Sequence, residues 1–258
     1  MAHEFDGRKY ERASAHQKEW GTKLIAELGL RGSERVLDLG CGDGTLTAQI
    51  AALLPRGSAL GIDASEGMIG VARQKRTENL DFLLMDINDL SFVEEFNVVY
   101  SNATLHWVKD HQLLLANVQR CLRPDGLLRF NFAGDGNCSH FFRVIREAMS
   151  LDSFSPFFVD FQWPWYMPAV GDYETIAGQS DLRDVRVWGE NADRLFPDAE
   201  ALTNWIDQPS LVPFLPLIGE QERNSFRDYV VQRMIEETAQ PDGRHFETFR
   251  RINFFARK

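Results

Sequence analysis

The sequence predicts an α/β fold, a doubly wound and mostly parallel sheet with helices on both faces. Apolar runs of strand length alternate with helical patterns as far as residue 133. Such alternation is typical of parallel strands joined by right-handed crossovers. The composition agrees, because 258 residues that are 44% hydrophobic and 26% charged suffice for one sizeable globular domain.

The individual elements follow from periodicity and from the residues that interrupt it. A first helix is expected over 10–28, where Trp20, Leu24, Ile25 and Leu28 recur at helical spacing. Short apolar runs bounded by glycine, proline or aspartate indicate strands over 35–39, 58–62, 80–85, 96–100 and 127–132. The helices between them are expected over 45–54, 66–75 and 111–121.

The pattern becomes less regular after Gly134. We expect helices over 141–149, 173–179, 199–206 and 220–238, a sixth strand over 182–188 and a last strand over 247–256. The aromatic segment over 151–170 is interpreted as packing that also forms one wall of a pocket. The chain between the sixth and last strands is expected to be a helical insertion that covers the carboxyl edge of the sheet.

Composition restricts the class of partner. The formal net charge of -10 disfavours nonspecific binding to nucleic acid or to an anionic membrane, since both require a basic face. The three cysteines lie far apart and form no CxxC pair, which predicts a reducing compartment without a metal or disulfide framework. The polar start predicts no signal peptide, and no apolar run could cross a bilayer. We therefore expect a cytoplasmic protein with a small-molecule partner, in an oligomeric state that the sequence leaves open.

The strongest motif is a glycine-rich loop between the first predicted strand and the next helix. It reads Asp38-Leu-Gly-Cys-Gly-Asp-Gly44. Glycines at 40, 42 and 44 let the backbone turn tightly and approach a ligand closely. The spacing is GxGxG, whereas the dinucleotide motif is GxGxxG. The Asp38 carboxylate would repel a pyrophosphate but could accept a hydrogen bond from an ammonium group.

Two further acidic residues end the next strands. Asp63 follows the second strand, 19 positions after Gly44, where it can accept hydrogen bonds from both ribose hydroxyls. Asp86 follows the third strand and can accept from an adenine amine while Ile87 packs on the ring. Since ligands of such sheets bind beyond the carboxyl ends of the strands, the ordered set predicts a nucleoside site.

These segments resemble the class I S-adenosylmethionine-dependent methyltransferases. The resemblance is carried by Val36-Leu-Asp-Leu-Gly-Cys-Gly-Asp-Gly44, by Gly61-Ile-Asp-Ala-Ser65 with Met68, and by Leu122-Arg-Pro-Asp-Gly126. The segment Ser101-Asn-Ala-Thr-Leu-His-Trp-Val108 is similar to the trans-aconitate methyltransferase subgroup, as are Trp205, the helix over 220–237 and residues 251–258. In that subgroup glutamine often precedes the tryptophan, whereas this chain has His106, a difference that concerns the acceptor and not the cofactor.

The resemblance implies a Rossmann-like sheet of seven strands, the last of them antiparallel. It implies a single methyltransferase domain over 1–258, with a cofactor-binding core (1–133), a substrate cap that includes the sixth strand (134–246) and the last strand (247–258). It also implies that S-adenosylmethionine is bound by residues at the carboxyl edge of the sheet and in the N-terminal segment. The positions that match are Tyr10, Gln17, Asp38, Gly40, Gly42, Gly44, Asp63, Ala64, Met68, Asp86, Ile87, Asn102, Ala103 and Trp107.

Two side chains after the fourth strand are candidates for the chemistry. His106 could act as a general base, since histidine titrates near neutrality, or could only shape the pocket. Trp107 could place its electron-rich ring near the positive sulfur, or could anchor the loop to the core. Methyl transfer itself requires alignment of the acceptor in a site without water, and an ionised carboxylate acceptor needs no base.

The reaction that the sequence favours is O-methylation of a carboxylate on a small acid such as trans-aconitate. The alternatives are methylation of another acceptor, namely an acyl-carrier thioester acid, a phenol, an amine or an isoprenoid carbon. A non-catalytic scaffold that binds S-adenosylmethionine is a further possibility. An NAD-dependent dehydrogenase is disfavoured, because its dinucleotide motif is absent and Asp38 would face the pyrophosphate.

Overall fold

The fold was determined as a computed structural model, which describes residue 4 and residues 15–258. The chain forms two compact units. Unit 1 comprises residues 1–135, 165–190 and 251–258, and unit 2 comprises residues 136–164 and 191–250. Unit 1 is therefore built from three separate stretches of sequence, and it contains the strands that come first and last along the chain.

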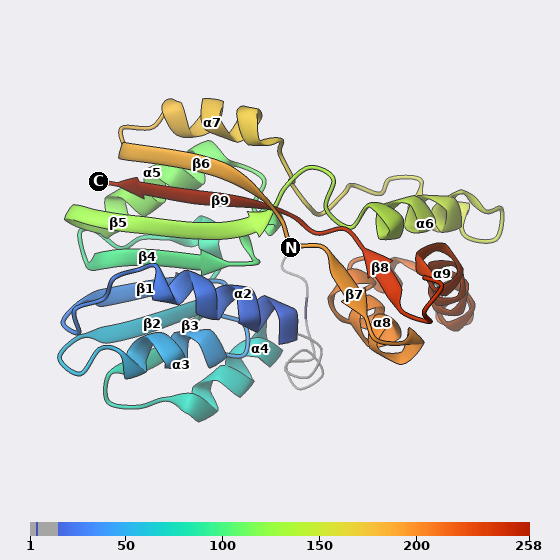
Figure 1. Cartoon of the computed structure of the whole chain (residues 1–258), viewed down its shortest axis with the longest axis horizontal. Helices are drawn as coiled ribbons and strands as arrows, with labels where there is room; N and C mark the ends of the chain where they lie inside the picture. Colours follow the sequence, from blue (N-terminus) through green and yellow to red (C-terminus); the bar gives the residue numbers. More distant parts are fainter. Residues whose placement is uncertain (1–3, 5–14) are drawn as a thin grey trace. The chain divides into compact units, whose positions relative to one another are not determined.

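Unit 1 contains a seven-stranded sheet (Figure 1). Its spatial order is β3-β2-β1-β4-β5-β9-β6, and β9 is antiparallel to β5. This confirms the predicted Rossmann-like α/β fold. The strands are β1 (Arg35–Leu39), β2 (Ser58–Asp63), β3 (Leu80–Leu84), β4 (Phe96–Asn102), β5 (Leu122–Ala133), β6 (Arg183–Asn191) and β9 (Arg250–Arg257).

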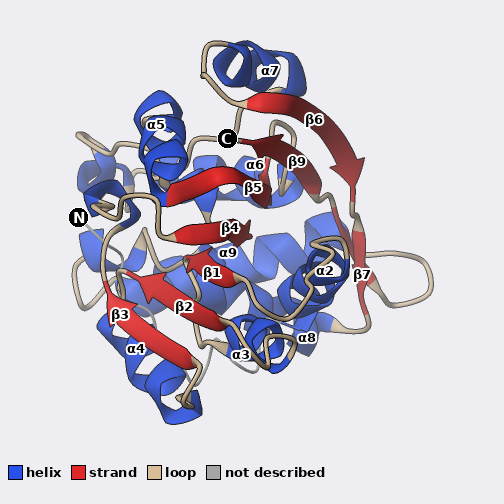
Figure 2. Ribbon diagram, turned by 90° about the vertical axis from the view of Figure 1, so that its left-hand side faces the viewer, coloured by secondary structure: helices blue, strands red, loops and turns tan. Residues whose placement is uncertain are grey.

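Helices cover both faces of this sheet (Figure 2). One core joins α2, α3 and α4 to one face through Leu24, Ile50, Ile69 and their neighbours. The other core joins α5 and α7 to the opposite face. The helices are α2 (Ala15–Ala26), α3 (Thr45–Ala52), α4 (Glu66–Ala72), α5 (His111–Cys121) and α7 (Val170–Gly178), with short 3-10 turns η1 (Arg73–Lys75), η2 (Ile87–Asp89) and η3 (Leu105–Trp107).

The alternation of side chains along β1 explains how one strand serves both cores. Leu37 and Leu39 belong to the core under α5 and α7, whereas Val36 belongs to the core under α2 and α3. Successive side chains of a strand point to opposite faces, so Asp38 lies on the face of α3. Its carboxylate accepts a hydrogen bond from Thr47 of α3, at 2.7 Å.

Unit 2 is mainly helical and has an aromatic interior. Phe154 and Phe158 are buried and pack with Phe214 and Phe226, as expected for the aromatic segment. Its elements are α6 (Ser139–Ser150), η4 (Ser155–Phe158), β7 (Arg194–Phe196), α8 (Ala199–Trp205), the π-turn η5 (Ile206–Ser210), η6 (Leu215–Leu217), α9 (Arg223–Thr238) and β8 (His245–Glu247). Among the described residues, no helix is long and apolar enough to traverse a bilayer.

The expected last strand over 247–256 is divided in the structure. Residues His245–Glu247 form β8, which pairs with β7 in a separate two-stranded sheet, and β9 begins only at Arg250. The break has a physical reason, because the fully buried Glu247 carboxylate accepts hydrogen bonds from two N–H groups in the first turn of α6, those of His140 and Phe141. Capping α6 takes the chain out of the large sheet at this point.

Candidate functional site

The glycine-rich loop adopts a conformation that glycine favours. Gly40, Gly42 and Gly44 all have positive φ, at 72°, 55° and 77°. A Cβ at Gly40 would lie 2.1 Å from the Cγ2 atom of Thr104, so a side chain at this position is excluded for steric reasons as well. The loop backbone is fixed to β2, since the N–H groups of Gly40 and Cys41 both donate to the Ile62 carbonyl at 2.9 Å. The sequence therefore folds here into a rigid bend at the end of β1.

Asp38, two residues before Gly40 on β1, is only 2% exposed. Burial raises its pKa to about 7, the charge of Asp63 acts in the same direction, and the bond from Thr47 opposes both. The ionised form of this buried carboxylate is unfavourable unless a cation lies nearby, since burying an unpaired charge costs free energy. Thr47 was not among the predicted site residues, although it lies nine positions after Asp38 on the expected helix.

Asp63 connects the glycine loop to the start of α4. Its Oδ2 atom accepts from the Gly42 N–H and its Oδ1 atom from the Ser65 N–H, both at 3.0 Å. Burial raises the pKa of Asp63 against the effect of these N–H donors. A carboxylate has about four lone-pair sites, so Asp63 retains acceptor capacity for hydroxyl groups.

Residue Glu4 also contacts this region, which the sequence did not predict. Its carboxylate accepts hydrogen bonds from the Ser65 hydroxyl, at 3.0 Å, and from the Gly67 N–H, at 2.7 Å. It lies on the first turn of α4, where an acidic group compensates free N–H donors and the helix dipole. No local sequence signal connects Glu4 with a helix more than 60 residues away.

The third acidic residue follows β3. Asp86 caps the short turn η2, since its Oδ1 atom accepts from the backbone N–H of Asn88 at 2.9 Å. Ile87 and Met68 are both buried, at 8% and 4% exposure, and Ala64 is partly buried. Because β3, β2 and β1 are parallel neighbours, the residues that follow them come together at one edge of the sheet.

The end of β4 adds two uncompensated acceptors to this edge. Asn102 pairs in register with Asn131 of β5, and its side-chain N–H donates to the Gln17 carbonyl at 2.9 Å. The side-chain oxygens of Asn102 and Gln17 are buried without a hydrogen-bond partner. Ala103 has a φ of 58°, unusual for a residue with a Cβ, and its N–H donates to the Asn131 carbonyl at 2.7 Å. Tyr10, the other N-terminal site residue that we predicted, lies outside the described residues.

The loop after Ala103 contains His106 and Trp107. The Tyr166 N–H donates to the His106 carbonyl at 2.7 Å, and the ring of Trp107 lies 5.4 Å from that of Trp165. These contacts hold η3 against residues 165–166 of the same unit. The Nδ1 atom of His106 is buried and has no hydrogen-bond partner.

The electrostatic surroundings make His106 a weak base. Burial lowers its pKa to about 3, the positive charge of Arg251 acts in the same direction, and so would a proton on His111. Burial also lowers the pKa of His111 to about 4. Arg251 lies on β9 next to β5, where its guanidinium donates to the side-chain oxygen of Asn131 at 2.7 and 2.8 Å and stacks on Trp20. Arg251 was included in the family resemblance but not among the predicted site residues.

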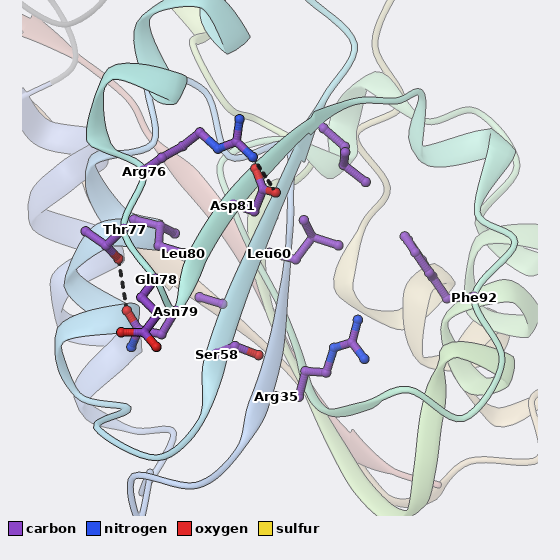
Figure 3. A pocket seen from close by; sticks show the side chains of 12 residues that line it. Arg35, Ser58, Leu60, Arg76, Thr77, Glu78, Asn79, Leu80, Asp81 and Phe92 are labelled. Atoms are coloured by element: carbon purple, nitrogen blue, oxygen red, sulfur yellow. Dashed lines mark hydrogen bonds and ion pairs between the residues drawn. The ribbon is translucent and has the colours of Figure 1, made fainter.

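A separate depression lies at the opposite edge of the sheet, around the starts of β1, β2 and β3 (Figure 3). Three of its charged residues, Arg35, Arg76 and Asp81, form ion pairs. Arg76 pairs with Asp81 at 2.8 Å, and Arg35 pairs with Glu95 at 3.0 Å. Since the predicted nucleoside residues all lie at the carboxyl edge, this depression contains none of them.

Comparison with known proteins identifies the class. A family described as methyltransferase domains matches residues 36–126. The chain is 31% identical over 229 residues to a trans-aconitate 2-methyltransferase of Deinococcus radiodurans, covering 86% of both chains. It is 35% identical over 130 residues to a malonyl-[acyl-carrier protein] O-methyltransferase of Bacillus cereus, covering 48% of both.

A solved structure supports the same fold. The phosphoethanolamine N-methyltransferase 2 of Haemonchus contortus, in complex with S-adenosylhomocysteine and phosphomonomethylethanolamine, superposes with a TM-score of 0.63 at 20% identity. The alignment covers 98% of this chain and 56% of that one. The chain thus belongs to the class I methyltransferases and uses S-adenosylmethionine as its cofactor. Within the class it falls in the subgroup that contains the trans-aconitate 2-methyltransferases.

The residues at the carboxyl edge fit this cofactor. The bend at Gly40 and Gly42 has positive φ at both residues, and glycine carries no Cβ that would keep a ligand away from the backbone. The buried, unpartnered side-chain oxygens of Gln17 and Asn102 are acceptors, as an ammonium group requires. The buried Asp38 carboxylate gains a favourable charge interaction only when a cation is nearby.

Proposed function

We propose that this methyltransferase O-methylates a carboxylate of a small di- or tricarboxylic acid similar to trans-aconitate. Two kinds of relative support the proposal. The trans-aconitate 2-methyltransferase and the malonyl-[acyl-carrier protein] O-methyltransferase both have names that denote a carboxylic acid as acceptor. An acyl-carrier thioester acid is the second candidate acceptor on the same ground, and it has the same reacting group.

The proposed cofactor contacts follow the order of the strands. Asp38, with the side-chain oxygens of Gln17 and Asn102, would accept hydrogen bonds from the ammonium group of the methionine portion. Asp63 would accept from the two ribose hydroxyls, and Asp86 from the adenine amine. The glycine loop, Ala64, Met68 and Ile87 would line the nucleoside, with Ala103 and Trp107 near the sulfur, as the family resemblance implies. S-adenosylmethionine supplies an electrophilic methyl group when it is bound there.

The observation that carries the proposal is the weak basicity of the groups near Ala103. Burial holds the pKa values of His106 and His111 at about 3 and about 4, so both rings are neutral and are poor proton acceptors at pH 7. A phenol or an ammonium group must lose a proton before or during attack, whereas a carboxylate is already ionised. The site therefore suits an acceptor that needs no base.

In the proposed step, a carboxylate oxygen of the acceptor forms a bond to the methyl carbon. The bond between sulfur and that carbon breaks, and its electron pair returns to sulfur. No proton moves, and the products are a methyl ester and a thioether. The contribution of the protein is to align the two atoms and to exclude water, which supplies much of the acceleration in such reactions.

The experiment is incubation of the purified protein with methyl-labelled S-adenosylmethionine and a panel of acceptors. The panel contains trans-aconitate, malonate, a monocarboxylate, catechol and ethanolamine. We expect label in a product that mild alkali hydrolyses, with the di- and tricarboxylates only. Asp63→Ala serves as the variant without cofactor binding, and Glu78→Ala, at an exposed carboxylate on the opposite edge of the sheet, as its control. Label that is stable to alkali, on the phenol or the amine, would overturn the proposal.

A further inference from the structure

The His106 side chain has a buried Nδ1 atom without a hydrogen-bond partner. The loop that carries it is fixed at four points. Thr104 donates to the Gly40 carbonyl at 3.1 Å, and the side chain of Leu105 is fully buried. The Leu105 carbonyl lies 3.0 Å from His111 Nε2, and the His106 carbonyl accepts from the Tyr166 N–H at 2.7 Å.

A polar atom that is buried without a hydrogen-bond partner is unfavourable, so such atoms point to a ligand that would supply the partner. Among the described residues, few buried side-chain atoms lack a partner, and three of them belong to Gln17, Asn102 and His106. All three lie in unit 1, on the segments that border the end of β4. The first two are oxygens, which suit the ammonium group of the cofactor. The imidazole nitrogen is different, because a neutral ring can donate as well as accept.

We infer that the Nδ1–H group of neutral His106 donates a hydrogen bond to the carboxylate that is to be methylated, and so selects the acceptor. The inference rests on the proposed function. It gives His106 a role other than that of general base: the ring keeps its proton throughout and binds the acceptor through it.

The charged and titratable groups around the ring are consistent with this role. The positive charge of Arg251 on β9 opposes protonation of the ring, and His111 on α5 would oppose it further if it were protonated. Lys109, on the same loop, donates to the Trp165 carbonyl at 3.0 Å. Burial lowers the pKa of Lys109 and raises that of Tyr166. A neutral donor next to the cationic Arg251 favours an anionic acceptor over an amine.

The test is a matched pair of substitutions measured in the complex with S-adenosylhomocysteine, which cannot react. Asparagine and leucine have nearly the same size, but only asparagine can donate from the position of Nδ1. Calorimetry would give the Kd of trans-aconitate for the wild type, His106→Asn and His106→Leu. If the melting temperature shows that the leucine variant is not folded, His106→Ala takes its place.

We expect the leucine variant to bind trans-aconitate ten- to a hundredfold more weakly, as for loss of a hydrogen bond to a charged group. The asparagine variant should remain within about threefold of the wild type, and S-adenosylhomocysteine should bind all three equally. Turnover of the wild type should show no ionisation between about pH 6 and pH 9 that can be assigned to His106.

Two results would overturn the inference. One is a leucine variant whose trans-aconitate affinity equals that of the wild type. The other is an equal fall of kcat in both variants at unchanged affinity, with a histidine ionisation in the wild-type pH profile, which would make His106 a base. If the wild type methylates no carboxylate and binds no trans-aconitate, the proposed function fails, a result that is distinct from either of these.

Discussion

Replacing Asp38 by asparagine should make the free protein more stable and the cofactor complex weaker. In the free protein the carboxylate is 2% exposed, and burial raises its pKa from the ordinary 3.8 to about 7. The difference corresponds to about 4 kcal/mol between the protonated and the ionised form. The folded state therefore binds the proton more tightly than the unfolded state, and ionisation of Asp38 destabilises the fold as pH rises from about 4 to about 7.

Asparagine has no charge to bury and can keep the hydrogen bond with Thr47. The free energy of unfolding of Asp38→Asn should therefore exceed that of the wild type by up to about 4 kcal/mol above pH 7. Between about pH 6 and pH 8.5 the difference should grow by about 1 kcal/mol, because the wild-type carboxyl is then still losing its proton. Urea unfolding at both pH values, without cofactor, measures it.

The affinity for S-adenosylhomocysteine should change in the opposite direction. Loss of a charged hydrogen-bond partner for the ammonium group should weaken binding by roughly ten- to a hundredfold. In the wild type, affinity should fall as pH decreases below about 7, because the proton on Asp38 must leave before the ammonium binds; in the variant this dependence should disappear. Glu78→Gln, at an exposed carboxylate on the opposite edge of the sheet, is the control. A variant that is less stable than the wild type at pH 8.5, with unchanged affinity, would refute the reasoning.

Three other substitutions test separate parts of the structure. Gly40→Ala adds a Cβ at a φ of 72° and 2.1 Å from the Cγ2 atom of Thr104. It should lower the free energy of unfolding by more than about 2 kcal/mol in urea titrations and abolish cofactor binding. Stability and binding equal to those of the wild type would show that the loop can rearrange to accept a side chain. Glu247→Gln removes a charged acceptor from the start of α6. It should reduce the melting temperature and leave the affinity for S-adenosylhomocysteine unchanged. An unchanged melting temperature would contradict the capping role. Arg251→Met removes a positive charge that lowers the pKa of His106, so the His106 resonance should titrate at a higher pH in NMR spectra. An unchanged titration pH would mean that burial alone lowers the pKa of His106.

The sequence predicted the parts of the fold that depend on local patterns. The strands of unit 1 are short apolar runs with clear boundaries, and the order of Asp38, Asp63 and Asp86 along them is enough to assign one edge of a parallel sheet. The turn conformation of Gly40 could also be anticipated, since only glycine adopts a positive φ freely.

The remaining features depend on contacts between residues far apart in sequence. The division of the last strand results from Glu247 capping a helix that begins more than 100 residues earlier. The desolvation of the His106 ring and the charge of Arg251 decide whether the ring is a base, and neither can be read from the Leu-His-Trp segment alone. The contact of Glu4 with the first turn of α4 also joins residues far apart in sequence. Sequence periodicity predicts single helices and strands, whereas these contacts join different elements and therefore could not be predicted from it.

The most direct measurement is a crystal structure of the complex with S-adenosylhomocysteine. The account predicts that the ammonium group lies within hydrogen-bond distance of the Asp38 carboxylate and of the side-chain oxygens of Gln17 and Asn102. It also predicts that both ribose hydroxyls donate to Asp63. A complex in which the ribose lies away from Asp63, or in which the ligand occupies the opposite edge of the sheet, would contradict it.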